Sequence, residues 1–96
     1  MNNGFISSRM SPMEVFCLMT DGDAKSARAL LQMARTKSFT LSDLLALDSM
    51  GIYGHNLYLF WRKYCKKNAK KMRETIDAFC SGKLSSKEIH EALPKK

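Results

Sequence analysis

Apolar residues recur every three or four positions along most of this chain, and a polar residue that suits a helix N-terminus precedes each apolar run. Ser11 and Ser85 each stand three residues before a glutamate, which makes a capping box, and Asp23 and Thr40 take the same place before two other runs. No segment shows the sustained period-two alternation of a strand. The pattern predicts an all-α fold, a compact bundle of about five helices over residues 11–20, 23–37, 40–50, 55–80 and 85–93.

The apolar positions of the second and third predicted helices define the expected core. In the second helix they are Ala27, Leu30, Leu31 and Ala34, and the residues expected to face solvent are Lys25, Arg28, Gln32 and Arg35. In the third helix they are Leu41, Leu44, Leu45 and Leu47. A chain of 96 residues has room for one core, so residues 1–96 are expected to form a single helical domain with flexible ends at residues 1–9 and 95–96.

Residues 55–80 allow two interpretations. An unbroken helix would be about 37 Å long, at about 1.5 Å per residue. Alternatively, Asn68 caps a new segment, because asparagine is a favoured N-cap residue, and the helix is broken near residues 66–68. The sequence leaves both interpretations open.

The segment from residue 62 to residue 73, called the basic segment below, carries the net charge of the chain. Its seven cations are Arg62, Lys63, Lys66, Lys67, Lys70, Lys71 and Arg73, and no carboxylate occurs between residues 49 and 73. Sixteen Lys and Arg less these seven leave nine, which balance the nine Asp and Glu, so the formal charge of +7 resides in this segment. On a helical wheel the cations take about half the circumference and apolar residues the other half. The basic segment is therefore predicted to present a cationic face that attracts an anionic partner.

Aromatic residues cluster beside these cations: Tyr53, Tyr58, Phe60, Trp61 and Tyr64. One interpretation is a stacking platform for unpaired bases, with lysines following the phosphate backbone. The other is that Trp61 and Tyr64 belong to the core, because positions 57, 61 and 64 lie along one helical seam. The spacing favours the core interpretation.

No catalytic or metal-binding motif is present. His55 and His90 are the two histidines, they fall on different predicted helices, and no metalloprotease motif, phosphate loop or nucleophile elbow occurs. Cys17, Cys65 and Cys80 are odd in number and widely spaced, which favours reduced thiols over a disulfide framework or a zinc site. We expect a protein that is not an enzyme and that needs no metal and no cofactor.

Two side chains outside the basic segment are weaker binding candidates. His55 lies near a helix start beside Asn56 and two glycines, where exposed backbone N–H groups favour a phosphate, although an ordinary surface imidazole is the simpler interpretation. Tyr58 is the second candidate, as one of the aromatic residues beside the cations. His90 is expected to be solvated on the last helix.

The stretch Leu47-Asp48-Ser49-Met50-Gly51-Ile52-Tyr53-Gly54, continued by Trp61, Tyr64 and Cys65, resembles a segment of small uncharacterised proteins from phages and mobile elements of Firmicutes bacteria. Met19-Thr20-Asp21-Gly22-Asp23 with Ala29-Leu30-Leu31 is similar to a second segment of that group, and the likeness covers about residues 15–80. The group usually has proline and glycine where this chain has Ala24 and Lys25, and glycine and acidic residues where it has the lysines after Cys65. The resemblance implies a phage or mobile-element setting and no particular activity.

Location follows from what the sequence lacks. No apolar run approaches the length of a bilayer span, and the first residues lack the basic start and apolar stretch of a secretory signal. We therefore expect a cytoplasmic protein, which the resemblance places in a bacterial host cell. A membrane partner is not expected, because so small a core needs the apolar side of the basic helix.

Like charges three or four residues apart cost a helix roughly 0.2–0.5 kcal/mol per pair, and the basic segment has several such pairs with no compensating carboxylate. This cost favours a binding role. We expect a non-catalytic phage or mobile-element protein that docks its basic helical face on an acidic or nucleic-acid-binding surface of a host nucleic-acid-processing defence complex, as an anti-CRISPR-like inhibitor. The alternative is direct, largely sequence-independent binding of nucleic acid.

Overall fold

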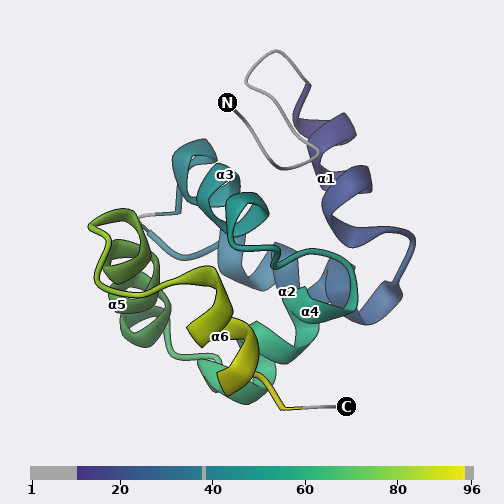
Figure 1. Ribbon diagram of the computed structural model, residues 1–96. Helices are drawn as coiled ribbons and strands as arrows, with labels where there is room; N and C mark the ends of the chain where they lie inside the picture. Colours follow the sequence, from purple (N-terminus) through teal and green to yellow (C-terminus); the bar gives the residue numbers. More distant parts are fainter. Residues whose placement is uncertain (1–10, 38, 95–96) are drawn as a thin grey trace.

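The computed structural model describes residues 11–37 and 39–94, and every regular element in this part of the chain is a helix (Figure 1). The elements are α1 (Pro12–Thr20), α2 (Ala24–Ala34), α3 (Leu41–Ser49), α4 (His55–Tyr58), the π-helical segment η1 (Leu59–Tyr64), α5 (Ala69–Cys80) and α6 (Ser86–Ala92). They pack into a body of 29 × 29 × 26 Å. The predicted all-α bundle is confirmed, whereas the predicted flexible ends, residues 1–9 and 95–96, lie outside the described residues.

Local capping sets where the helices begin. The hydroxyl of Ser11 accepts the amide N–H of Glu14 at 3.3 Å, and the Glu14 carboxylate accepts the amide of Ser11 at 2.9 Å. The same reciprocal pair starts α6, and at α3 the Asp43 carboxylate accepts the amide of Thr40 at 2.9 Å. Asn68 starts α5, because its side-chain oxygen accepts the amide of Lys71 at 3.0 Å. Each predicted helix start is therefore confirmed.

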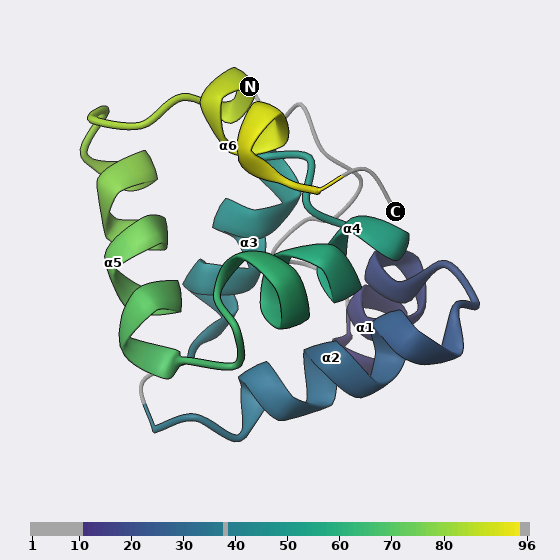
Figure 2. The ribbon, with the colours of Figure 1, turned by 90° about the horizontal axis from the view of Figure 1, so that it is seen from below.

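The chain breaks between η1 and α5, so the 37 Å rod does not exist. Lys66 and Lys67 have φ of 54° and 59°, a left-handed conformation that ends a helix. Asn68 then caps α5, which runs in a different direction from α4 (Figure 2). Of the two interpretations of residues 55–80, the split near 66–68 is confirmed.

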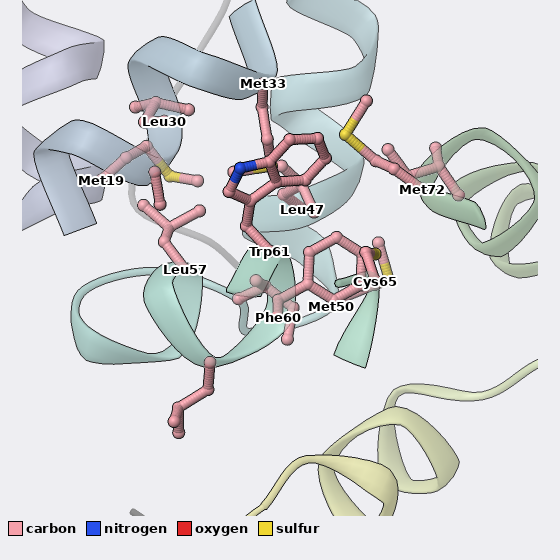
Figure 3. Packing of buried hydrophobic residues seen from close by; sticks show 14 of the residues in the cluster. Met19, Leu30, Met33, Leu47, Met50, Leu57, Phe60, Trp61, Cys65 and Met72 are labelled. Atoms are coloured by element: carbon pink, nitrogen blue, oxygen red, sulfur yellow. The ribbon is translucent and has the colours of Figure 1, made fainter. Parts of the chain in front are cut away.

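The core lies where η1 meets α2 and α3. Phe60 and Trp61 are 0% and 4% exposed, and the indole of Trp61 is directed toward Met33 of α2 and Leu47 of α3 (Figure 3). The core interpretation is therefore confirmed for Trp61, whereas Tyr64 is half-buried and packs against the edge of the core. Phe60 and Trp61 can offer no ring face to a ligand.

The predicted apolar face of α2 is wrong, because the buried face is rotated about the helix axis from the predicted one. The side chains that α2 buries are Ser26, Ala29, Leu30 and Met33. Leu31 is 49% exposed, because α2 packs against both α1 and α4 and the buried stripe is centred between them. The buried hydroxyl of Ser26 has two acceptors within hydrogen-bond distance, the Asp23 carboxylate and the carbonyl of Gly54, and its single proton can be donated to either.

His90 is exposed on the last helix, as predicted, and one of its ring nitrogens also links α6 to the end of α3. Its Nε2 lies 2.7 Å from the carbonyl oxygen of Met50, which also accepts the hydroxyl of Ser86 at 3.0 Å. Gly51 makes this contact possible, because a Cβ there would lie 2.7 Å from Nε2 of His90. Its φ of 79° also favours glycine.

Candidate anion-binding surface

The basic segment is spread over three elements. Arg62 and Lys63 lie on η1, Lys66 and Lys67 form the turn, and the remaining three cations lie at the start of α5. All are exposed except Arg73, which is half-buried. The predicted single cationic helix face is therefore wrong, because the left-handed turn redirects the chain in the middle of the segment.

Arg73 is not part of the exposed charge. Its guanidinium donates to both carboxylate oxygens of Asp43, at 2.6 and 3.0 Å, and to Asp77 at 3.2 Å. The side chain of Asp43 is only 7% exposed, so this fork joins α5 to α3 inside the fold. Arg73 was predicted as a binding residue, and the structure instead makes it a link between helices.

This pairing changes the protonation of both groups. Burial raises the pKa of Asp43, but the hydrogen bonds from Arg73 and Thr40 outweigh it, so the pKa lies below its ordinary value. The hydrogen bond to Asp43 raises the pKa of Arg73. Both groups therefore stay charged and paired near neutral pH.

The other six cations of the basic segment keep their predicted exposure. None of them forms an ion pair with the part of the chain that the structure describes. Lys71 is partly ordered, because its Nζ lies 4.9 Å from the centre of the Tyr64 ring. Six uncompensated charges therefore surround the η1–α5 turn.

Helix α2 adds two cations that the sequence did not place in the site. Because α2 packs against α4 and η1, Lys25 and Arg28 lie beside Tyr58 and Arg62. The basic surface, as we use the term below, is the set of eight exposed cations Lys25, Arg28, Arg62, Lys63, Lys66, Lys67, Lys70 and Lys71. The sequence predicted that Lys25 and Arg28 face solvent, but no local signal indicates that α2 lies next to η1.

The tyrosines of this surface carry cations over their rings. The Nζ of Lys25 lies 5.3 Å from the centre of the Tyr58 ring, and the Cζ of Arg62 lies 5.8 Å from it. Tyr64 is covered by Lys71 in the same way. A base that stacked on these rings would have to displace the cations, so the stacking interpretation gains no support.

His55 is paired with a carboxylate. Its Nδ1 lies 3.6 Å from Asp23, and its ring stacks on Tyr58 with 5.5 Å between centres. The hydrogen bond from Ser26 lowers the pKa of Asp23, so a negative charge faces the imidazole at neutral pH. The prediction that His55 binds phosphate is therefore disfavoured, because an anion would meet this carboxylate.

The thiols offer no activated nucleophile at this surface. Cys65 is buried, and burial raises the pKa of its thiol to about 12, so it stays protonated. Cys17 and Cys80 are exposed and free. Within residues 11–37 and 39–94, no group of three His, Cys, Asp or Glu could hold a metal ion.

A second surface is apolar and was not predicted. A groove of about 310 Å³ lies among α1, α2 and α3, and its lining residues are Val15, Phe16, Leu30, Ala34, Phe39, Thr40, Leu41 and Leu44. Three leucines are more than two-fifths exposed, and all are on these helices: Leu18, Leu31 and Leu41. No cation of the basic surface lines the groove.

No protein-family model, curated protein or solved structure matches this chain. The resemblance to phage and mobile-element proteins therefore stays a prediction. What the protein does has to be argued from its two surfaces.

Proposed function

We propose that this protein binds nucleic acid directly, without catalysis and largely without sequence preference, through the phosphates of the backbone. The observation that carries the proposal is the basic surface: eight exposed cations with no carboxylate partner among the described residues. Clustered lysines and arginines bind nucleic acid by releasing the counterions of its phosphates, and this requires no fixed geometry at each contact.

The position of the exposed apolar residues favours nucleic acid over an acidic protein surface as the partner. Tight protein interfaces depend on a few buried apolar or aromatic anchors, and charged rims contribute less affinity. Leu18, Leu31 and Leu41 are the large apolar side chains most exposed in the described chain; Leu41 lines the apolar groove, and the other two lie on the helices α1 and α2 that help to form it. The basic surface would therefore offer a protein partner positive charge but no apolar anchor. Phosphates need only the positive charge.

The residue types favour backbone contacts over base recognition. Five of the eight cations are lysines at or beside the η1–α5 turn. A lysine binds a phosphate as a point charge on a flexible side chain. Sequence readout in a groove relies on side chains fixed on a helix or ribbon that enters it. Because the tyrosine rings are covered, duplex DNA or RNA is a better ligand than a single strand that stacks its bases.

The second candidate is docking on a host nucleic-acid-processing defence complex, as an anti-CRISPR-like inhibitor. The apolar groove and the exposed leucines of α1, α2 and α3 favour it, because they supply the anchor that the basic surface lacks. The basic surface would then compete with the nucleic acid of that complex. In either case we place the protein in the cytoplasm of a bacterial host cell.

Within the described chain no helix is long and apolar enough to cross a bilayer. Membrane lipid is not proposed as a partner, because the apolar sides of α4, η1 and α5 are used in the core.

The test is a fluorescence-anisotropy titration of labelled duplexes of about 20 base pairs, in two unrelated sequences, at about 50 mM salt. We expect binding to both duplexes with affinities that agree within about threefold, because phosphates carry no sequence information. Absence of binding to either duplex would overturn the proposal. Strong preference for one sequence would overturn the proposal that the protein binds through the phosphates of the backbone.

A further inference from the structure

One part of the basic surface is hollowed. Between α2 and η1 lies a hollow of about 20 Å³, and the residues that line it are Lys25, Arg28, Ala29, Gln32, Tyr58 and Arg62. A space of about 10–15 Å³ is enough for one water, so the hollow admits one small polar atom and leaves the rest of a ligand at its mouth. Half of the lining side chains are cations.

Gln32 lines this hollow, and its side-chain NH₂ group is available to donate a hydrogen bond there. The indole N–H of Trp61 donates to Oε1 of Gln32 at 2.7 Å. An indole nitrogen can only donate, so this contact fixes which end of the amide is oxygen. The amide nitrogen of Gln32 therefore remains as a donor, on a side chain held by the core.

Two of the three cations around the hollow lie over an aromatic ring. Lys25 and Arg62 lie over the Tyr58 ring at 5.3 and 5.8 Å, from two different helices. Arg28 adds a third positive charge, and none of the three forms an ion pair with the described residues. Like charges gathered around one hollow repel one another, and an anion at its mouth would relieve that repulsion.

We propose that this hollow is a phosphate site. One oxygen of a backbone phosphodiester enters the hollow and accepts from the Gln32 amide, while Arg28 and Arg62 donate to the oxygens at the mouth and Lys25 adds charge. Donors that come from α2 and η1 suit a tetrahedral phosphate, and guanidinium groups bind it in pairs of hydrogen bonds. The oxygens of a phosphodiester point in tetrahedral directions, whereas the two oxygens of a carboxylate lie in one plane and face donors from only one side.

The site deepens the proposed function and rests on it. It identifies where nucleic acid is held with defined geometry, as distinct from the exposed lysines that attract it. The arginines are thereby expected to matter for their shape as well as for their charge.

The test keeps the charge and changes the shape. Arg28→Lys and Arg62→Lys are each expected to weaken duplex binding about fivefold to tenfold, because lysine loses the bidentate fork. Arg35→Lys is the matched control, since Arg35 is exposed, caps the C-terminus of α2 seven residues after Arg28 and does not line the hollow. Wild-type affinity in both hollow variants, with thermal midpoints unchanged, would overturn the site and leave the proposed function standing.

A second readout needs no duplex. Inorganic phosphate is titrated into nitrogen-15-labelled wild type, with sodium chloride at equal ionic strength as the reference. We expect saturable shifts of the Gln32 side-chain amide and of the Arg28 and Arg62 Nε–H signals in phosphate only. Equal shifts in both salts would overturn the site, whereas saturable shifts in a protein that binds no duplex would overturn only the proposed function.

An acidic peptide separates phosphate from carboxylate. Polyglutamate is added as competitor to the wild-type complex with the duplex. We expect polyglutamate to compete only through non-specific electrostatic attraction to the cations, and to leave the Gln32 side-chain amide signal unshifted. A saturable shift of that signal by polyglutamate would overturn phosphate selectivity and favour an acidic protein as the partner.

Discussion

The hollow beside Tyr58 and the turn formed by Lys66 and Lys67 are both positively charged, but their side chains differ in how many contacts they make. At the hollow, cations from α2 and η1 are held by an aromatic ring and lie beside an amide fixed by Trp61. At the turn, Lys66 and Lys67 are exposed neighbours in sequence, and none of their side-chain contacts fixes them within the described chain. Under the proposed function, the turn would supply attraction and the hollow would supply geometry.

Arg73 marks the limit of this comparison. It belongs to the same basic segment as the turn, but Asp43 and Asp77 neutralise it. Charge in the sequence is thus available to a partner only where the fold provides no carboxylate for it.

The largest effect is expected from charge reversal at the turn. Lys66→Glu with Lys70→Glu should weaken duplex binding by roughly 100-fold at about 100 mM salt, because two phosphate contacts are replaced by repulsion. The control is Lys83→Glu with Lys87→Glu, which makes the same change in net charge. Lys83 also lies in a turn and Lys87 also takes the second position of a helix.

We expect the control pair to lose much less affinity than the turn pair in the same anisotropy titration. If the two pairs weaken binding equally, net charge alone determines affinity. The assignment of binding to the basic surface is then contradicted.

The next effect separates stability from binding. Arg73→Met should lower the free energy of unfolding by about 1–3 kcal/mol, because it leaves Asp43 buried without its charged partner. Its duplex affinity should stay within about threefold of wild type. Lys70→Met is the matched variant, and urea denaturation with duplex titration should show the reverse pattern, with full stability and reduced affinity.

The pH dependence of stability tests the same ion pair. Because the folded pKa of Asp43 lies below its ordinary value of 3.8, the pair stabilises the fold above that value and the stabilisation is lost as pH falls through the folded pKa. Between about pH 5 and pH 3, wild type should lose more unfolding free energy than Asp43→Asn. Parallel pH curves in urea denaturation would contradict this account of Arg73.

The smallest effect is expected at the turn backbone. Lys66 has φ of 54°, which costs a residue with a Cβ about 1–2 kcal/mol. Lys66→Gly should therefore raise the free energy of unfolding by about 0.5 kcal/mol, after the added freedom of glycine in the unfolded chain is counted. Its duplex affinity should fall only a fewfold, since one charge is removed and none reversed.

The helix boundaries could be predicted because capping is local. Ser11, Thr40, Asn68 and Ser85 each act within three residues, so the sequence window that contains them also contains their partners. The fold class follows from these signals and from the helical period. The inward face of α2 could not be predicted, because the burial of Ser26 depends on a carbonyl 28 residues further along the chain.

The candidate site was predictable only in part, for the same reason. Exposure of six cations follows from one local pattern. Arg73 was assigned wrongly because its partner Asp43 is 30 residues away. Gln32 and Arg28 were missed as site residues, since only the packing of α2 on η1 brings them beside Arg62.

The most direct test of the central claim is the salt dependence of duplex affinity for the wild-type protein. If the basic surface neutralises about 4–6 phosphates, a plot of log affinity against log salt between about 50 and 200 mM should have a slope near −4 to −5. A slope near zero, or affinity that Lys66→Glu with Lys70→Glu leaves unchanged, would contradict binding through these cations.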